Sequence, residues 1–350
     1  MTAPVSISGT GLAGVPVAPI PLTRKDFTAA NDVRWCPGCG DYPVLAAFQS
    51  IMPDLGIRNE NLVVVSGIGC SSRFPYYVES YGFHSIHGRA PAVAAGVAMS
   101  RPDVSVFVIT GDGDALSIGG NHLIHAIRRN INMTILLFNN RIYGLTKGQY
   151  SPTSETGKVT KSSPMGSVDN PFNPVSLALG AGGTFVARTV DANRAHLTET
   201  IKAAAAHRGT SLVEIYQNCV IFNDGAYDPL KAADGMIKLV HGQPVTFGAD
   251  NSMGVVRGVN GTLTVAPVAE IGQENLLVHD AHAEDPQLAF ALAQLTDQNH
   301  LTTAPIGIFR DVERPVYDDL ARAQIATFDS DEDRDQAVSA LLKGHDTWEL

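Results

Sequence analysis

Two short apolar runs, separated by one segment of helical length, constrain the fold of this chain more than any other feature. Residues 104–110 and 133–138 are short apolar runs that are rich in β-branched side chains. This pattern is typical of parallel strands that are buried on both faces. Residues 121–130 between them have the length and pattern of a helix. The same alternation of strand and helix patterns runs from residue 41 to residue 216, so we expect an α/β fold with a doubly wound, mostly parallel sheet.

The predicted elements divide the chain into three parts. Residues 1–30 form an extended arm rich in Pro and Gly, residues 31–222 form the ligand-binding domain, and residues 223–350 form a C-terminal extension that packs on the sheet or on a partner subunit. The loop 144–174 is long enough to indicate a functional or partner-bound segment. The predicted strands are 61–66, 104–110, 133–138, 184–188, 211–216, 261–268 and 306–309, and the predicted helices are 41–52, 89–99, 121–130, 174–183, 192–207, 286–295 and 334–342.

Charge and hydropathy exclude two classes of partner. A net charge of −10 argues against nonspecific nucleic-acid binding, which relies on a basic surface. The sequence has no apolar run of the ~18 residues that a membrane span requires, so we expect no membrane partner. The N-terminus lacks the basic start and compact apolar block of a secretory signal, and a cytoplasmic location is therefore expected.

Polar side chains follow the two central strands at the points where they end. Asp112 lies in the sequence Gly-Asp-Gly-Asp after the first strand, and Asn140 follows the second. Both points lie at the carboxyl edge of a parallel sheet, where ligands usually bind. Mg²⁺ prefers oxygen ligands together with substrate phosphates, which Asp112, Asn140 and the backbone carbonyl of Ile142 would supply. Gly111 and Gly113 let the main chain approach a phosphate closely, and the amides that open the next helix add donors.

This spacing of Gly-Asp-Gly and Asn-Asn resembles the thiamine diphosphate signature. A single Gly-Asp-Gly is also an ordinary turn, but here both halves of the signature stand in the expected strand context. The resemblance implies thiamine diphosphate and Mg²⁺ as cofactors.

The chain has four cysteines, Cys36, Cys39, Cys70 and Cys219, all in segments next to strand or helix ends. Disulfides are not expected in a cytoplasmic protein. A redox-active Cys36–Cys39 pair would leave the other two as inert thiols. A site with four thiolates uses all of them, and one C-x-x-C joined by two distant cysteines favours an iron–sulfur cluster over zinc. The cysteines alone leave these interpretations open.

Six motifs and the late Cys219 together resemble the β subunits of 2-oxoacid:ferredoxin oxidoreductases, specifically the 2-oxoglutarate type. The motifs are WCPGCG, GIGCSSR, HGRA, GDGD, NHLIHAIRRN and NNRIYGLTKGQYSPT. The resemblance covers roughly residues 33–222. It implies that the four cysteines bind one [4Fe-4S] cluster. It also implies the reversible, coenzyme A-dependent oxidative decarboxylation of 2-oxoglutarate to succinyl-CoA and CO₂, with electrons passing through the cluster to ferredoxin.

The resemblance also assigns residues to the cofactor. His87 is expected at the diphosphate; from the residue alone it would be an ordinary hydrogen-bonded loop histidine. The other contacts implied for the diphosphate and thiazolium are Ile68, Gly69, Cys70, Ser71, Gly113, Asp114, Gly144 and Leu145.

Two basic residues are candidates for the substrate carboxylates. Arg73 and Lys147 each lie just beyond a cofactor-contacting motif. An Arg suits bidentate carboxylate recognition, and a Lys supplies a point charge. The alternative for each is a solvated surface charge. A dicarboxylate such as 2-oxoglutarate needs a second positive group, whereas pyruvate does not.

One part of a thiamine enzyme is missing from the sequence. Such enzymes activate the cofactor through a glutamate on a second α/β domain, and one sheet accounts for most of this chain. The resemblance implies that an α subunit supplies that domain, in an αβ pair that is often doubled. The alternatives are a pyruvate or branched-chain 2-oxoacid enzyme, a nonredox thiamine decarboxylase or synthase, and a zinc-stapled binding protein.

Overall fold

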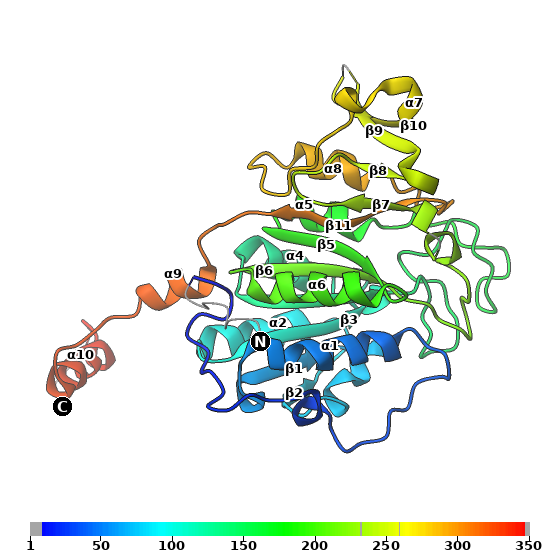
Figure 1. Ribbon diagram of the computed structural model, residues 1–350. Coiled ribbons are helices and arrows are strands. Elements are labelled where there is room, and N and C mark those ends of the chain that lie inside the picture. Colours follow the sequence, from blue (N-terminus) through cyan, green and yellow to red (C-terminus); the bar gives the residue numbers. More distant parts are fainter. Residues whose placement is uncertain (1–8, 232, 259, 347–350) are drawn as a thin grey trace.

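The computed structural model describes residues 9–231, 233–258 and 260–346. At its centre lies an eight-stranded sheet with the order β2-β1-β3-β4-β6-β5-β11-β7 (Figure 1). Its neighbouring strands are parallel except at one place, where β11 runs antiparallel to β5. This confirms the prediction of a mostly parallel α/β fold. The strands of this sheet are β1 Leu62–Ser66, β2 Tyr81–His84, β3 Ser105–Gly111, β4 Met133–Asn139, β5 Phe185–Val190, β6 Thr210–Tyr216, β7 Met236–Leu239 and β11 Ala304–Asp311.

Helices cover both faces of the sheet and enclose two apolar cores. On one face lie α1 and α6, which also contact each other. On the other face lie α2, α4, α5 and α8. The α-helices are α1 Asp41–Leu55, α2 Ala90–Ser100, α3 Asp112–Leu116, α4 Gly120–Arg129, α5 Pro174–Gly180, α6 Arg194–Ala206, α7 Val268–Ile271, α8 Gln287–Ala293, α9 Tyr317–Ala323 and α10 Asp331–Lys343. The 3-10 helices are η1 Arg24–Phe27, η2 Asn59–Asn61, η3 Ser71–Tyr76, η4 Asp228–Leu230, η5 Ala233–Gly235, η6 Ala249–Asn251 and η7 Gln273–Asn275.

Local chemistry explains where these elements begin and end. The central strands β1 and β4 are buried along their whole length, in line with their unbroken apolar sequences. Helix α4 ends where Asn130 adopts φ = 53°, a left-handed conformation that Asn tolerates. Helix α5 begins with Asn173, whose side chain accepts a hydrogen bond from the Ser176 amide.

The segment beyond residue 222 contributes to the same sheet. Strands β7 and β11 extend it on the β5 side, and a separate antiparallel sheet has the order β10-β9-β8. The strands of this small sheet are β8 Thr246–Phe247, β9 Met253–Arg257 and β10 Leu263–Pro267. Helix α10 stands away from the body at the end of the chain (Figure 1).

The N-terminal segment packs on the body where the structure describes it. Leu12 and Val15 are buried in the core beneath α1 and α6, and the Gly11 amide donates to the Ala206 carbonyl. Residues 1–8 of the predicted arm lie outside the described residues. Among the described residues, no helix combines the length and apolar character needed to cross a bilayer.

Several elements were not predicted from the sequence, namely strands β2, β7, β8 and β9 and helices α3, α7 and α9. The edge strand β2, with the sequence YGFH, is exposed along its whole length, so no buried pattern marked it. The Gly-Asp-Gly-Asp segment, predicted as a turn, contributes Asp112, Gly113 and Asp114 to the first turn of the short helix α3. Residues 140–173 contain only turns and isolated bridges, as the predicted long loop requires.

Candidate functional site

A pocket lies at the carboxyl ends of β1, β3 and β4. It gathers residues from the turn after β1, the start of α3 and the loop after β4, which are far apart in sequence but adjacent at one edge of a parallel sheet. Every residue assigned above to thiamine diphosphate or Mg²⁺ lines it. The lining residues are Ile68, Gly69, Cys70, Ser71, His87, Gly111, Asp112, Gly113, Asp114, Phe138, Asn140, Ile142, Tyr143, Gly144, Leu145 and Thr146.

Asp112 is held by two hydroxyl groups from the long loop. Its Oδ2 accepts hydrogen bonds from Ser151 Oγ at 2.5 Å and from Thr153 Oγ1 at 2.6 Å. Burial raises the pKa of Asp112, and the two hydroxyl donors oppose that rise because they stabilise the carboxylate. A buried carboxylate at a pocket wall suits a cation, which would favour its charged form further.

Asp114 joins three segments of the pocket wall. Its Oδ1 accepts from the Gly88 amide at 2.7 Å and the Ile68 amide at 3.2 Å, and its Oδ2 accepts from Thr110 Oγ1 at 2.7 Å. His87 Nδ1 also contacts Oδ1. The Asp114 carboxylate therefore has its hydrogen-bond partners within the chain. It ties the turns after β1 and β2 to strand β3 and fixes the orientation of the His87 ring.

Gly113 allows a close approach that another residue would prevent. A Cβ at this position would lie 2.1 Å from Cε1 of Tyr143. The Tyr143 hydroxyl donates to the Gly113 carbonyl at 3.0 Å. The ring thus packs flat against the backbone that the sequence places next to the diphosphate.

The two asparagines after β4 face in different directions. Asn140 lines the pocket, whereas Asn139 is buried and donates from Nδ2 to Glu214 Oε1 at 2.7 Å. Asn139 Oδ1 accepts from the Arg141 amide at 3.2 Å and lies 2.8 Å from Thr153 Oγ1. Successive residues of a strand point to opposite faces, so one asparagine serves the pocket and the other anchors it.

Ser71 provides a test of whether a ligand fits here. Its hydroxyl is buried, lines the pocket, and has no hydrogen-bond partner among the described residues. Buried polar groups are nearly always paired, so this hydroxyl is suited to a polar ligand. Together with Asp112, Asn140 and the cradle at Gly113, it fits a metal-bound diphosphate.

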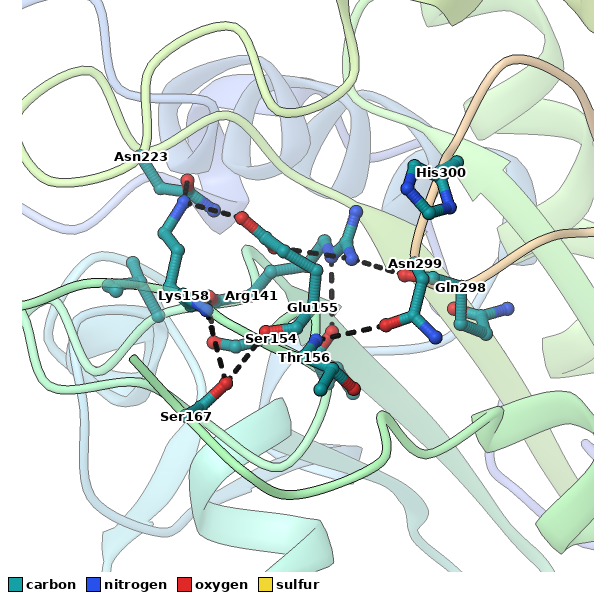
Figure 2. A network of polar contacts seen from close by, with 12 residues as sticks. Arg141, Ser154, Glu155, Thr156, Lys158, Ser167, Asn223, Gln298, Asn299 and His300 are labelled. Atoms are coloured by element: carbon teal, nitrogen blue, oxygen red, sulfur yellow. Dashed lines mark hydrogen bonds and ion pairs between the residues drawn. The ribbon is translucent and has the colours of Figure 1, made fainter. Parts of the chain in front are cut away.

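The loop after β4 is tied down by a polar network (Figure 2). Arg141 has the left-handed φ of 59°, and its buried guanidinium donates to the carbonyls of Thr153 and Gln298 and pairs with Glu155. Lys158 pairs with Glu155 at 2.9 Å. A non-glycine residue in this conformation is held by its surroundings, which is common at functional sites.

The same network reaches the pocket and the C-terminal segment. Lys158 Nζ donates to Asn223 Oδ1 at 2.6 Å (Figure 2). Asn223 Nδ2 in turn donates to the Asn140 carbonyl at 2.9 Å. The Thr156 amide donates to Asn299 Oδ1 at 2.9 Å. The long loop is therefore fixed on one side to a pocket residue and on the other to the segment before β11.

The four cysteines converge beside the pocket. A Cβ on Gly144 would lie 3.5 Å from Sγ of both Cys70 and Cys219. Cys39 lies close enough to Cys70 and Cys219, and Cys70 to Cys36, for their charges to interact. Cys70 itself lines the pocket, and Trp35 Nε1 donates to its carbonyl at 2.7 Å.

The surroundings of these thiols disfavour free thiolates. Burial, with a further contribution from the Asp41 carboxylate, raises the pKa of Cys70 to about 12 and raises that of Cys39 as well. Such thiols ionise when a cationic centre binds them. No three His, Cys, Asp or Glu side chains in the part of the chain that the structure describes are grouped as a single metal ion requires. In a [4Fe-4S] cluster each thiolate binds a different iron, so the sulfurs stay further apart than around one ion.

The two basic candidates lie outside the pocket lining. Arg73 is half-buried in η3, and its Nη1 donates to the Arg34 carbonyl at 3.2 Å. Its positive charge lowers the pKa of Cys70, which opposes the larger effects of burial and Asp41. Lys147 is exposed, with φ = 75°. Both lie near pocket residues in the sequence. Cys70 precedes Arg73 by three positions, and Thr146 directly precedes Lys147.

Sequence reasoning missed the residues that support this site. Tyr143, Phe138 and Thr146 line the pocket, and Ser151 and Thr153 hold Asp112. The motif YSPTS offered closely spaced hydroxyls in a loop expected to be functional. Nothing in the sequence showed that these hydroxyls return to a carboxylate about forty residues earlier.

Known proteins resemble this chain along nearly its whole length. Residues 67–215 match the thiamine pyrophosphate enzyme family model, C-terminal TPP binding domain. The chain is 60% identical to 2-oxoglutarate oxidoreductase subunit KorB of Mycobacterium tuberculosis over 340 residues, which is 96% of this chain and 91% of that protein. It is 47% identical to subunit beta of 2-oxoacid:ferredoxin oxidoreductase 2 of Aeropyrum pernix over 57% of this chain and 64% of that protein.

A solved structure gives the same relationship. The 2-oxoglutarate:ferredoxin oxidoreductase from Magnetococcus marinus, with 2-oxoglutarate, coenzyme A and succinyl-CoA bound, has a chain that superposes with a TM-score of 0.74 at 33% identity. The match covers 93% of this chain and 99% of that one. With the pocket and its lining residues, these similarities show that the chain belongs to the family of 2-oxoacid:ferredoxin oxidoreductase β subunits that includes the 2-oxoglutarate oxidoreductase subunit KorB.

Proposed function

We propose that this chain is the β subunit of a 2-oxoglutarate:ferredoxin oxidoreductase. The reaction converts 2-oxoglutarate and coenzyme A to succinyl-CoA and CO₂, passes the electrons to ferredoxin, and is reversible. The 60% identity to a 2-oxoglutarate oxidoreductase subunit supports this substrate. The observation that carries the proposal is that Cys70 lines the same pocket as Asp112 and Asn140 while lying beside the other cysteines.

The pocket residues fit thiamine diphosphate with Mg²⁺. Asp112, the Asn140 side chain and the Ile142 carbonyl would hold the cation, and Ser71 and the backbone at Gly113 would contact the cofactor. When bound, thiamine diphosphate supplies the electron sink that decarboxylation of a 2-oxoacid needs. The chain itself would orient the cofactor, because Asp114 fixes the backbone at Gly88 and Tyr143 fixes the backbone at Gly113.

Cys36, Cys39, Cys70 and Cys219 fit one [4Fe-4S] cluster. Their buried members are poor thiolates without a cationic partner, and their arrangement does not match a single ion. A structural zinc needs four ligands at roughly 2.3 Å from one point, so the zinc-stapled alternative has less support. Because Cys70 touches both regions, the path from cofactor to cluster within this chain is short.

Arg73 and Lys147 are the proposed partners of the substrate carboxylates. Arg73 sits one turn beyond Cys70 on η3, and Lys147 follows the pocket residue Thr146. Two positive groups match a dicarboxylate. In this proposal Arg73 has the stronger effect because it is half-buried, whereas the charge of Lys147 is screened by solvent.

The proposal also covers the other parts of this chain and the partners that it would bind. The proposed domains are an N-terminal arm of residues 1–30, a domain of residues 31–222 that would hold both cofactors, and a C-terminal extension of residues 223–350. Strands β7 and β11 of the extension join the main sheet. An α subunit would supply the second thiamine-binding domain, in an αβ pair or a doubled one. Ferredoxin and coenzyme A are the other proposed partners.

The test is anaerobic, coenzyme A-dependent reduction of a viologen dye by the chain copurified with its partner subunit. The proposal expects faster reduction with 2-oxoglutarate than with pyruvate, in protein that is brown and contains iron. Faster reduction with pyruvate would overturn the substrate assignment and leave the family in place. Colourless protein with bound zinc would overturn the cluster and the redox function with it.

A further inference from the structure

A row of buried polar side chains in close contact leads away from Asp112. Thr153 Oγ1 lies 2.6 Å from Asp112 Oδ2 and 2.8 Å from Asn139 Oδ1. Asn139 Nδ2 donates to Glu214 Oε1 at 2.7 Å, and Arg188 Nε donates to Glu214 Oε2 at 2.7 Å. None of these side chains is more than 2% exposed. The row begins at the pocket and ends in the middle of the sheet, between β5 and β6.

The buried ion pair of Arg188 and Glu214, at the far end of this row, fixes the orientation of the Asn139 amide. Arg188 only donates and Glu214, when ionised, only accepts, so Asn139 must turn its amide nitrogen to Glu214. Its oxygen then faces Thr153 and the Arg141 amide, which donates to it at 3.2 Å. The Arg188 guanidinium is fixed further by Thr296 Oγ1 at 3.0 Å and by the Tyr216 ring. A fully buried pair of this kind is rigid because breaking it leaves an uncompensated charge.

The hydroxyl of Thr153 has one hydrogen and two acceptors. With Asp112 ionised, as a cation requires, that hydrogen goes to the carboxylate because a charge-assisted hydrogen bond is the stronger of the two. Ser151 donates to the same oxygen, Oδ2. In the part of the chain that the structure describes, the side-chain donors to Asp112 thus all reach Oδ2, which leaves Oδ1 for the cation.

The loop network holds Thr153 itself in place. Arg141 Nε donates to the Thr153 carbonyl at 3.1 Å, and Ser154 Oγ donates to the Arg141 carbonyl at 2.6 Å. Both belong to the network in Figure 2. The backbone and the hydroxyl of Thr153 are therefore fixed from two directions, by the loop and by the row of side chains.

We propose that Thr153 is a positioning residue that, together with Ser151, turns Asp112 toward the divalent cation. The inference rests on the proposed function, because it assumes that Asp112 binds the cation. Groups that orient a metal ligand affect metal affinity by about tenfold to 100-fold when removed.

The test uses the purified complex with its partner subunit, stripped of divalent cations and thiamine diphosphate by chelation. Mn²⁺ is then titrated with thiamine diphosphate present, and free Mn²⁺ is followed by its electron paramagnetic resonance signal. Thr153→Val removes the hydroxyl at nearly constant volume, and Thr153→Ser retains it. Thr210→Val is the matched control, because Thr210 is equally buried but donates to the Ile131 carbonyl at the amino end of β6.

We expect Thr153→Val to weaken Mn²⁺ binding about tenfold or more, and Thr153→Ser and Thr210→Val to stay within about threefold of the parent. Equal affinity for Thr153→Val and the parent would overturn the proposal, as would equal weakening in Thr153→Ser. If Thr153→Val does not assemble, Ser151→Ala, which removes the other donor, takes its place, and unchanged affinity there would equally contradict the proposal. Absence of thiamine-dependent Mn²⁺ binding in the parent would instead overturn the cofactor site on which the inference rests.

Discussion

The pocket edge of the sheet and the C-terminal arm, residues 325–346, differ in which side chains they bury and which they expose. At the pocket, polar groups such as Asp112, Asp114 and Asn139 are buried and bonded within the chain. Along the arm, apolar groups are exposed, with Leu341 at 84% and Leu342 at 82%. Burial of polar groups is costly unless they are paired, and Asp112, Asp114 and Asn139 are paired within the chain. The chain alone therefore fixes the pocket. The exposed arm gains little stability from packing on the rest of the chain. Changes at the pocket should therefore have large effects and changes along the arm small ones.

The largest effect is expected from Cys219→Ser. Loss of one thiolate should remove the cluster, so iron content should fall by about four per chain and dye reduction should cease. Iron analysis and visible absorbance measure this. Thiamine-dependent Mn²⁺ binding should persist, since the pocket lining does not include Cys219. Unchanged iron content would show that this cysteine is not a ligand.

Gly113→Ala should weaken thiamine diphosphate binding by about tenfold to 100-fold. The added methyl would displace the Tyr143 ring, and overpacking of this kind costs roughly 1–3 kcal/mol. Quenching of intrinsic fluorescence by the cofactor measures the affinity. Gly96→Ala is the control, because the added Cβ there meets nothing within 4 Å. Similar affinities for the two variants would contradict the close packing at Gly113.

Arg73→Met should raise KM for 2-oxoglutarate about tenfold, and Lys147→Met about threefold, because a half-buried charge is screened less than an exposed one. Steady-state dye reduction with 2-oxoglutarate and with pyruvate measures both. Neither variant should change KM for pyruvate by as much, since pyruvate lacks the second carboxylate. An equal rise for both substrates would place these residues outside substrate selection.

Glu155→Gln tests the loop network through its pH dependence. Burial by itself would raise the pKa of Glu155, but the hydrogen bond from Lys158 and the charge of Arg141 outweigh it, and the pKa lies below its ordinary value. The stabilisation is therefore fully present above the ordinary pKa and is lost as the pH falls through the lowered one. At pH 7 the free energy of unfolding of the parent should exceed that of the variant by about 1 kcal/mol or less, and the difference should shrink as the pH falls below the ordinary carboxyl pKa. Denaturant unfolding at several pH values measures it, and a constant difference would contradict the ion pair.

The smallest effect is expected from deletion of residues 325–350. The exposed side chains of α10 contribute little burial within the chain, so the unfolding midpoint of the chain should shift by no more than about 2 °C. Circular dichroism on heating measures the shift. A drop as large as that of a core variant would show that the arm packs on the body.

Sequence reasoning succeeded where a pattern is local and failed where contacts are distant. The unbroken apolar runs of β3 and β4 and the Ala-rich α2 predicted their elements, because burial on both faces and close packing leave direct traces in sequence. The pocket residues followed from two strand ends in neighbouring positions. The edge strand β2 left no such trace, because it is exposed along its whole length. Thr153 and the Arg188–Glu214 pair were also missed, since hydrogen bonds between residues so far apart have no periodicity.

The positions of the four cysteines in the sequence also bear on the order in which folding and cluster loading occur. Cys36 and Cys39 precede α1, Cys70 follows β1, and Cys219 follows β6, with β3 and β4 lying between those two strands in the sheet. The cysteines meet only after the central strands have paired, and such non-local pairing is slow. The cluster that we propose for these cysteines would therefore not nucleate folding. On the ribosome, a nascent chain must extend well past residue 219 before it becomes competent to receive that group, which makes loading a late step in biogenesis.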